Sequence, residues 1–216
     1  MIKKVLITLI LALSTINAQN LQLHYDYGKA RDYYTLTFEM FDVDDYGSTF
    51  MFFDFDFDEE GQKSISLGYL EISRYIKLPG SDLFEAALHY NDGTAPWGRL
   101  GPVWLGGIKR DIDLGFFKFS FDILYRNGHH SDGKDAQIII AWHEKYYEKI
   151  TFTGFFDLWT TGKTKKRAVI LSEPQIWYNI WNELNVGMEL EITKNFLDSD
   201  KVEFMPTIGI KWDFTD

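Results

Sequence analysis

Two segments of this chain alternate large apolar and polar side chains, residue by residue. They read TFMFFDFDFD at residues 49–58 and FKFSFDILY at residues 117–125. Alternation with a period of two residues places one set of side chains on each face of a β-strand, and here the apolar set is mostly Phe. Strands of about ten residues with one apolar face and one wet face are typical of transmembrane β-barrels. The sequence therefore predicts an all-β fold, a transmembrane antiparallel up-and-down β-barrel.

The N-terminus predicts export. Lys3 and Lys4 make a basic start, residues 5–16 are apolar, and Ala18 is a small residue of the kind that signal peptidase accepts. The apolar run is shorter than the roughly 20 residues of a transmembrane helix. We therefore expect a cleaved signal peptide at residues 1–18 and one barrel domain at residues 19–216, located in the outer membrane of a Gram-negative bacterium.

The chain is acidic and contains no Cys. Its formal net charge is -10, and loss of Lys3 and Lys4 with the signal peptide changes this to -12. Because binding to nucleic-acid phosphates depends on Lys and Arg, we expect no nucleic-acid partner. The absence of Cys excludes disulfides and a lipoprotein anchor. The expected partners are outer-membrane lipid and a small-molecule solute; the sequence predicts no cofactor, and we expect a monomer.

The alternation predicts about twelve strands, an even number as in bacterial single-chain barrels with both termini on the periplasmic side. In the fourth strand Ile65, Leu67 and Tyr69 share one face before Leu70 and Ile72 take over, which predicts a β-bulge. Connections assigned to the outer side are mostly longer than those assigned to the periplasmic side. The predicted strands cover residues 21–27, 33–41, 48–57, 64–77, 83–91, 103–108, 114–126, 135–143, 149–159, 168–178, 184–193 and 202–214.

A soluble all-β barrel or sandwich would share this alternation, but its apolar face would turn inward. Small barrel interiors fill with modest aliphatic side chains, whereas this apolar face is aromatic and too voluminous for such a core. It suits a lipid-facing band. Its predicted members are Phe53, Phe55, Phe57, Phe117, Phe119, Phe121, Tyr125, Trp142, Phe152, Phe156 and Trp212.

The opposite face should line the lumen, and it is rich in carboxylates. Aromatic rings beside carboxylates and amides can stack a flat ring and bind hydroxyl groups; the alternative is a lumen wall whose charges are compensated by Arg and Lys. Glu173, Gln175, Glu189, Glu191, His143, Trp104, Trp159 and Trp177 are assigned to the same face. The residues predicted to line the pore or contact substrate are Glu39, Phe50, Phe52, Asp54, Asp56, Glu71, Arg74, Glu85, His89, Lys118, Asp122 and Asp157; none is predicted to be catalytic or to bind a metal.

Five stretches carry a family resemblance: ARDYYTLTFEMFDVDDYGSTFMFFDFDFD (residues 30–58), YLEISRYIKL (69–78), WLGG (104–107), FTGFFDLW (152–159) and SEPQIWYN (172–179). Together they resemble an uncharacterised family of outer-membrane β-barrels related to the nucleoside-specific channel-forming protein Tsx. Glu39, Asp56, Glu71 and Asp157 stand where the acidic positions of the Tsx pattern fall. The resemblance implies a passive, substrate-selective pore of about twelve strands.

The main functional hypothesis is an outer-membrane channel for passive, selective passage of a small solute, with nucleosides as the candidate solute. An outer-membrane lipid-modifying hydrolase or acyltransferase is the alternative from another class. It would need a nucleophile and a base within about 3 Å of each other. Ser66, Ser73, Ser120 and Ser172 are the candidate nucleophiles, with His89 and His143 as bases. A structural or adhesive barrel is the third hypothesis.

Overall fold

The computed structural model of the chain describes residues 18–28, 31–57, 65–129, 135–162, 167–196 and 199–214. The predicted signal peptide lies outside these residues except for Ala18, which begins the first strand, and it stays a prediction. Among the described residues, no helix is long and apolar enough to cross a bilayer.

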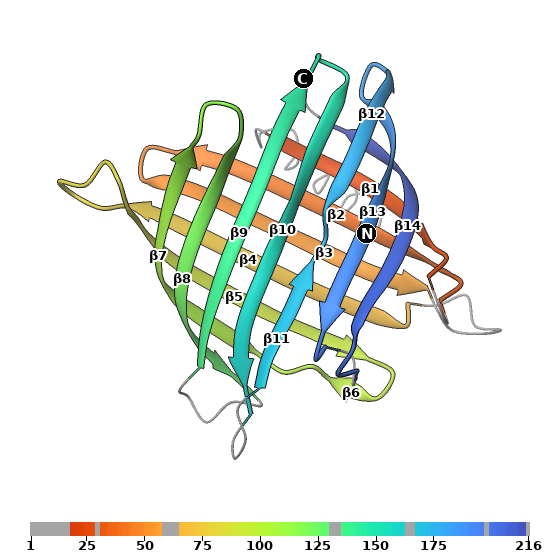
Figure 1. Ribbon diagram of the computed structural model, residues 1–216, viewed down its shortest axis with the longest axis horizontal. Helices are drawn as coiled ribbons and strands as arrows, with labels where there is room; N and C mark the ends of the chain where they lie inside the picture. The colour runs from red at the N-terminus through yellow and green to blue at the C-terminus, as the bar shows by residue number, and fades with distance from the viewer. Residues whose placement is uncertain are drawn as a thin grey trace, which may run out of the picture.

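The described chain is built from β-strands (Figure 1). The strands are β1 (Ala18–Asp26), β2 (Tyr33–Asp44), β3 (Gly47–Phe57), β4 (Leu67–Lys77), β5 (Glu85–Ala95), β6 (Gly98–Arg99), β7 (Val103–Asp113), β8 (Lys118–Gly128), β9 (Asp135–Tyr146), β10 (Ile150–Thr161), β11 (Arg167–Ser172), β12 (Gln175–Trp181), β13 (Leu184–Lys194) and β14 (Val202–Asp213).

These strands form a closed antiparallel barrel with twelve positions around its wall. The two-residue β6 pairs only with β5, while β11 and β12 share one position between β10 and β13. Pairing of β1 with β14 closes the ring, so the sheet has no free edge. The predicted fold class, a transmembrane antiparallel barrel of about twelve strands, is confirmed.

The connections between strands differ in length at the two ends of the barrel. Asp45 and Tyr46 join β2 to β3, and Asn182 and Glu183 join β12 to β13. These turns lie at the short-loop end, where β1 begins and β14 ends. The opposite, long-loop end carries the connections at residues 58–66 and 195–201. Transmembrane barrels place short turns in the periplasm and longer loops outside the cell.

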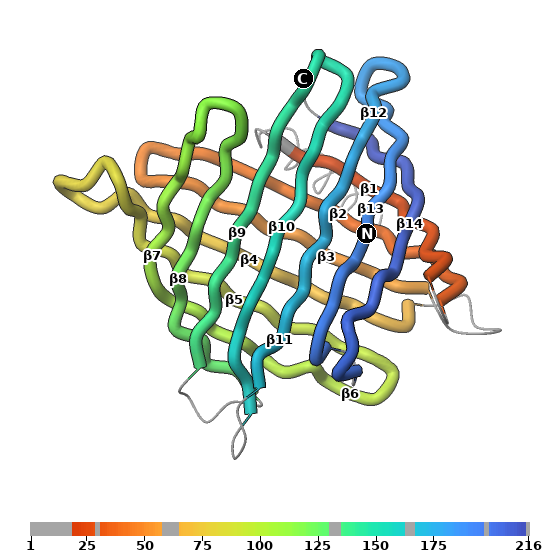
Figure 2. Tube along the Cα trace, in the orientation of Figure 1, coloured from red at the N-terminus to blue at the C-terminus, as the bar shows by residue number. Residues whose placement is uncertain are grey.

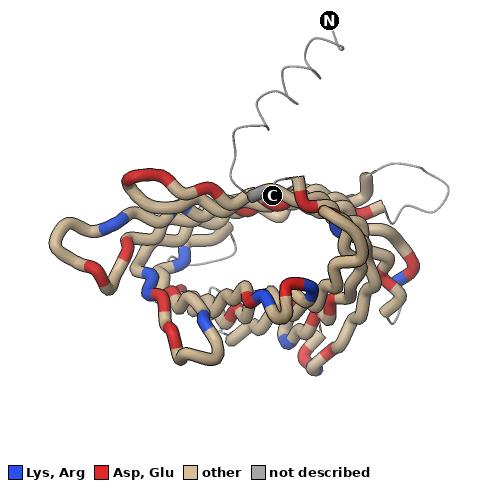
Figure 3. The backbone as a smooth tube through the Cα atoms, turned by 90° about the horizontal axis from the view of Figure 1, so that it is seen from above, with Lys and Arg blue, Asp and Glu red and all other residues tan. Residues whose placement is uncertain are grey.

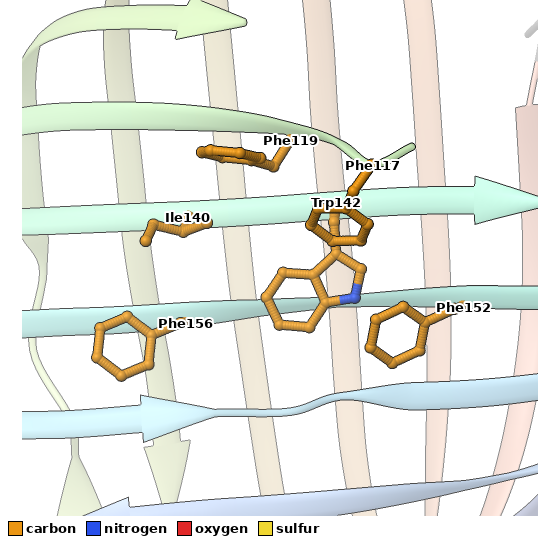
Figure 4. A pocket seen from close by; sticks show the side chains of 6 residues that line it. All are labelled: Phe117, Phe119, Ile140, Trp142, Phe152 and Phe156. Atoms are coloured by element: carbon orange, nitrogen blue, oxygen red, sulfur yellow. The ribbon is translucent and has the colours of Figure 1, made fainter. Parts of the chain in front are cut away.

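The outer face of the barrel is apolar and aromatic. Alternate residues such as Leu88, Ile123 and Ile210 are exposed. A hollow of about 330 Å³ in this face is lined only by Phe117, Phe119, Ile140, Trp142, Phe152 and Phe156 (Figure 4). Ring centroids of Trp142 and Phe152 lie 5.6 Å apart there. The volume argument from the sequence therefore holds for these large rings, which point away from the lumen.

The tenth predicted strand is interrupted at Glu173 and Pro174, where the chain runs on from β11 to β12 between the same neighbours (Figure 2). The register does not change: Ser172 lies opposite Phe156, and Gln175 lies opposite Thr153. Leu190 N donates to Pro174 O at 3.0 Å, but Pro has no N–H with which to return a bond. The interruption is therefore a missing ladder bond and not an inserted residue.

The β-bulge predicted in the fourth strand is wrong. Pairing of β4 with β3 runs without a shift from Leu67 opposite Asp56 to Ile76 opposite Gly47. Tyr69 therefore lies on the same face as Glu71. The Tyr69 ring lies on the polar lumen face, where its hydroxyl has polar partners: it donates to Glu71 Oε2 at 3.2 Å. The strand therefore needs no phase change to accommodate this aromatic residue.

Candidate functional site

The barrel is flattened into an oval (Figure 3). Figure 1 shows β1–β5 crossing behind β7–β14, so these two groups form the broad walls and meet at two narrow ends. One narrow end lies where β5 pairs with β7, and the other lies where β14 pairs with β1. Side chains pack tightly at both narrow ends, which leaves the polar groups of the broad walls to face each other.

The narrow end near β7 and β8 has a small apolar core. Ala87, Leu105, Leu124 and Ile139 are buried together on the lumen face. A polar group lies beside them: Ser73 Oγ is 3.0 Å from His89 Nδ1, and Asp122 Oδ2 is 3.5 Å from His89 Nε2. Tyr75 also donates to Asp122 at 3.0 Å. These contacts fill this end of the oval with protein.

The narrow end near β14 and β1 is organised around Trp177, which is fully buried. Its indole lies against the backbones of two inward-facing glycines; a Cβ at Gly187 would lie 2.4 Å from the ring, and one at Gly209 would lie 3.2 Å away. The His24 ring packs edge-on at 5.5 Å. Lys211 Nζ lies 5.1 Å from the indole centroid, within the range of a cation–π contact.

Four carboxylates line the first broad wall, and we call them the first-wall carboxylates: Glu39, Asp54, Asp56 and Glu71. They face the lumen from β2, β3 and β4. Each accepts a hydrogen bond from an uncharged side chain of the wall: Asn20 to Glu39 (2.9 Å), Thr37 to Asp54 (2.6 Å), Thr35 to Asp56 (2.7 Å) and Asn91 to Glu71 (2.9 Å). Uncharged donors orient these carboxylates. Their charge is offset only in part, by Lys211 near Glu39, Arg31 near Asp56 and Arg126 near Glu71.

Four more carboxylates face them, and we call them the second-wall carboxylates: Asp157, Glu173, Glu189 and Glu191. Gln137 donates to Asp157 at 2.8 Å, and Gln175 donates to Glu189 at 2.6 Å. Glu189 interacts electrostatically with Asp54, although β13 and β3 do not pair. Asp157 interacts in the same way with Glu71. The two sets of carboxylates are therefore close across the lumen.

The lumen carboxylates keep solvent-accessible surface even though the barrel is closed. Glu39, Asp54, Glu71, Glu173 and Glu189 are only partly buried, in contrast to the nearly inaccessible side chains at the narrow ends. Accessible surface inside a closed wall requires a space wide enough for water. The middle of the oval is therefore a water-accessible acidic slot between two packed ends.

Three aromatic rings form a ladder along the first wall. Ring centroids of Phe50 and Phe52 lie 6.0 Å apart, and those of Phe52 and Tyr69 lie 5.8 Å apart. Phe52 lies directly opposite Glu71, and Asn91 Nδ2 donates to the Tyr69 hydroxyl at 2.8 Å. The planes of neighbouring rings are tilted by 45° and 49°, so each ring offers its own apolar face beside hydrogen-bond acceptors, and a flat polar solute could stack on one of these faces.

Arg126 is the basic residue of the opposite wall. It donates to Gln137, and its guanidinium lies 5.1 Å from the Trp159 ring centroid. It interacts electrostatically with Glu71 and Asp157. The Arg126 guanidinium thus lies between carboxylates of both walls, beside an indole.

Most of the predicted pore-lining residues lie on the lumen face. Phe50, Phe52 and the first-wall carboxylates share the lumen face of β2–β4, with Asp157 across from them; their contact with a solute stays a prediction. His89 and Asp122 are packed into the β7–β8 end. Glu85 pairs with Lys109 at 3.1 Å, while Lys118 is largely exposed at the short-loop end and pairs with Asp113 at 3.0 Å.

Two predicted positions are wrong. Arg74 does not join the lumen carboxylates; it lies on the outer face opposite Leu88, bonding Asp44 at 2.9 Å and Thr49 at 3.0 Å. Positions 71 and 74 are an odd number of residues apart, so they point to opposite faces of one strand. Trp104 is also outside, with its ring 4.6 Å from Tyr90, because it is the neighbour of the inward-facing Leu105.

Sequence reasoning missed several groups that shape the slot. Arg126 has the same parity as Asp122, so alternation could have identified it. Tyr69 was assigned away from Glu71 because of the predicted bulge. Arg31, in the connection after β1, bonds Asp26 at 2.7 Å and Glu191 at 2.8 Å. Arg31 lies in a loop, where side chains do not alternate between two faces. The sequence pattern therefore could not predict that Arg31 points into the lumen.

Comparison with solved structures identifies the kind of barrel. A KdgM porin superposes with a TM-score of 0.54 at 6% identity, covering 90% of this chain and 98% of the porin. The NanC porin superposes with a TM-score of 0.55 at 12% identity, covering 90% of this chain and 99% of that chain. At such identities the likeness is one of fold.

A search of curated protein sequences finds no match. A family profile described as "Domain of unknown function (DUF5020)" matches residues 18–214, which is the whole barrel. The chain therefore belongs to this family of unknown function, and its fold is a closed transmembrane barrel similar to the KdgM and NanC porins.

Proposed function

We propose that this protein is an outer-membrane channel for passive, selective passage of a small polar solute, and that its acidic slot disfavours anions. One observation carries the proposal: carboxylates of two facing walls retain accessible surface inside a closed, lipid-compatible barrel. A barrel built only for stability has no need for so many carboxylates in its interior, because burying charge is costly. Rings of carboxylates are a common means of selecting cations in pores.

The comparison with KdgM supports a pore but not its solute. One KdgM structure is described as a complex with disordered oligogalacturonate, and it superposes with a TM-score of 0.53 at 6% identity. Oligogalacturonate carries many carboxylates. The slot of the present chain is itself lined by carboxylates, so like charges would repel such a ligand.

The finer proposal is that nucleosides are a solute of the channel, as the resemblance to the Tsx-related barrels implies. The ladder of Phe50, Phe52 and Tyr69 supports it, because a nucleobase can stack on these rings. Glu71 and Asp54 provide acceptors for ribose hydroxyls beside the rings. The proposal includes export through the predicted signal peptide and function as a monomer.

Single-channel recording in planar bilayers tests this function. The purified barrel should produce ionic current, and uridine added to the long-loop side should block it reversibly. Absence of current from a folded barrel would contradict the channel, whereas current without nucleoside block would contradict only the nucleoside.

A second candidate, an outer-membrane hydrolase, is favoured by the Ser73–His89–Asp122 contacts. The Ser73–His89 distance of 3.0 Å matches what a nucleophile and its base need, whereas Asp122 lies 3.5 Å from His89 Nε2, which has no hydrogen-bond partner among the described residues. Against it, the exposed fractions of these side chains are 3%, 1% and 0%, so no substrate can reach Ser73 in this conformation. The test is labelling with a serine-directed fluorophosphonate. Labelling of the wild type that is lost in Ser73→Ala would support the hydrolase, whereas no labelling of the wild type would contradict it.

A further inference from the structure

The acidic slot already binds one organic cation, which belongs to the chain itself. Arg31 enters the lumen from the connection after β1, at the long-loop end. Its Nη1 donates to Glu191 Oε2 at 2.8 Å and its Nη2 to Glu191 Oε1 at 3.2 Å, a bidentate contact, while Nη1 also reaches Asp26 Oδ2 at 2.7 Å. Paired donors on a rigid plane are the geometry with which a guanidinium binds a carboxylate.

Deeper in the slot, acceptors remain without donors. Asp157 is 8% exposed, and its Oδ1 has no hydrogen-bond partner among the residues that the structure describes. Asn91, 6% exposed, likewise has an unpartnered Oδ1, while its Nδ2 is used by Tyr69 and Glu71. Buried acceptors normally have donors. A ligand that satisfies both must be rich in N–H or O–H groups.

The charge of the slot selects among such ligands. Glu173 interacts electrostatically with Glu189, Glu191, Asp54 and Asp157. Against these carboxylates the described lumen offers Arg31 on Glu191, Arg126 beside Trp159 and Lys211 near Glu39. A donor-rich neutral molecule would leave the mutual repulsion of the carboxylates in place, whereas a cation with several donors would relieve it.

Glu173 lies among these carboxylates at the interruption between β11 and β12. Glu173 N donates to Phe155 O at 3.1 Å, and Pro174 follows immediately. Gly154 lies beneath, where a Cβ would come within 2.4 Å of Glu173 O. A proline in a central strand and a glycine under it both weaken a sheet, and departures of this kind concentrate at functional sites.

The spacing of the carboxylates distinguishes an organic cation from a metal ion. Within the described part of the chain, no three His, Cys, Asp or Glu side chains are grouped closely enough to hold a metal. The acceptors are instead distributed over both walls and along the slot. Phe50 and Phe52 add ring faces that attract ammonium and guanidinium groups.

We infer that the slot binds an elongated organic cation carrying two or more ammonium or guanidinium groups, in competition with Arg31 for Glu191. The inference rests on the proposed channel and names a solute class that differs from the neutral nucleosides, so block by uridine and binding of a polycation are tested separately. Arg31 thereby acts as a tethered competitor at the long-loop entrance, which a solute must displace before it passes.

Calorimetric titration of the detergent-solubilised full-length barrel with spermidine tests binding independently of conductance. Wild type should bind spermidine, and galacturonate should show no binding. Glu173→Gln should weaken spermidine binding about tenfold, the loss of one charge-assisted contact, and Arg31→Ala should strengthen it. The matched control is Glu148→Gln, on an exposed turn outside the lumen. Each variant must retain the heat-modifiable gel mobility of a folded barrel.

No spermidine binding by the folded wild type, or equal binding by wild type and Glu173→Gln, would overturn the inference even if the barrel conducts. Weaker binding in Arg31→Ala would overturn the competition. Spermidine binding without ionic current would instead contradict the channel function and still support the cation site. The two proposals therefore fail in different measurements.

Discussion

At the scale of single residues, the face that a side chain occupies decides its role, and sequence neighbours have opposite roles. Phe52 lies opposite Glu71 on the lumen face, whereas Phe53 lies opposite Leu70 on the lipid face. Both are partly buried Phe residues of the same strand. Their substitution therefore separates an effect on solute binding from a general effect on the barrel.

Phe52→Ala should weaken uridine block about tenfold, because stacking of a base on an aromatic ring contributes on the order of 1–3 kcal/mol. Phe53→Ala should leave the block constant unchanged. The measurement is the block constant from single-channel recordings of both variants. Equal constants in the two variants would place the solute away from the aromatic ladder.

Glu71 and Arg74 provide the second residue-scale prediction. Glu71→Gln removes a lumen charge that accepts bonds from Asn91 and Tyr69, so it should lower uridine block with conductance largely retained. Arg74→Gln removes contacts with Asp44 and Thr49 away from the lumen, and should alter neither the block nor the conductance. Lost block in Arg74→Gln would show that the lumen assignment of β4 is wrong.

At the scale of elements, the junction of β11 and β12 depends on its neighbour β10. Gly154 has φ +145°, a conformation that side chains other than Gly rarely adopt, and its missing Cβ makes room for Glu173 O. The interruption between β11 and β12 thus depends on Gly154 of β10 as well as on Pro174. Neither residue produces a break in the alternation that a sequence pattern could reveal.

Gly154→Ala should destabilise the barrel by about 1–3 kcal/mol, the usual cost of forcing atoms into filled space. Gly106→Ala is the matched control, because a Cβ at Gly106 meets nothing within 4 Å. The temperature at which the folded gel band converts to the unfolded one reports the difference. An unchanged conversion temperature for Gly154→Ala would mean that the junction can move away from β10.

At the scale of the whole molecule, closure accounts for the expected resistance to unfolding. Every barrel strand has a partner on both sides, and β14 pairs with β1, so the backbone is satisfied internally. The protein should fractionate with outer membranes and show heat-modifiable mobility on gels. Recovery as a soluble periplasmic protein after osmotic shock would contradict the membrane assignment.

The charge of the lumen leads to a second prediction at this scale. With carboxylates on both walls and few lumen bases, the pore should prefer cations weakly over anions. The reversal potential in a KCl gradient measures this preference. It should weaken at high salt, because mobile ions screen the carboxylates over about 3 Å at 1 M. A reversal potential that favours anions would contradict the acidic-slot assignment.

Many of the lumen-facing residues could be predicted from sequence, because the face on which a side chain lies depends only on its position within its own strand. Asp54, Asp56, Phe50 and Phe52 alternate along one strand, and their shared face follows from the backbone alone. The errors arose where the pattern was ambiguous. Tyr69 suits an apolar or a polar face, since it has a ring and a hydroxyl, so the pattern around it wrongly indicates a bulge. Arg74 was grouped with Glu71 although a spacing of three residues places the two on opposite faces.

The sequence by itself determined the transmembrane barrel, its strand count and the face of most side chains, because a two-residue period and the length of each apolar band are set within one strand. Only the tertiary structure decided which carboxylates face one another. Three contacts depend on closure, register and flattening of the barrel: the proximity of Asp54 to Glu189, the hydrogen bonds of Arg31 to Glu191 and the contact of Ser73 with His89. These are relations between distant segments, and no local pattern in the chain encodes the width of a lumen.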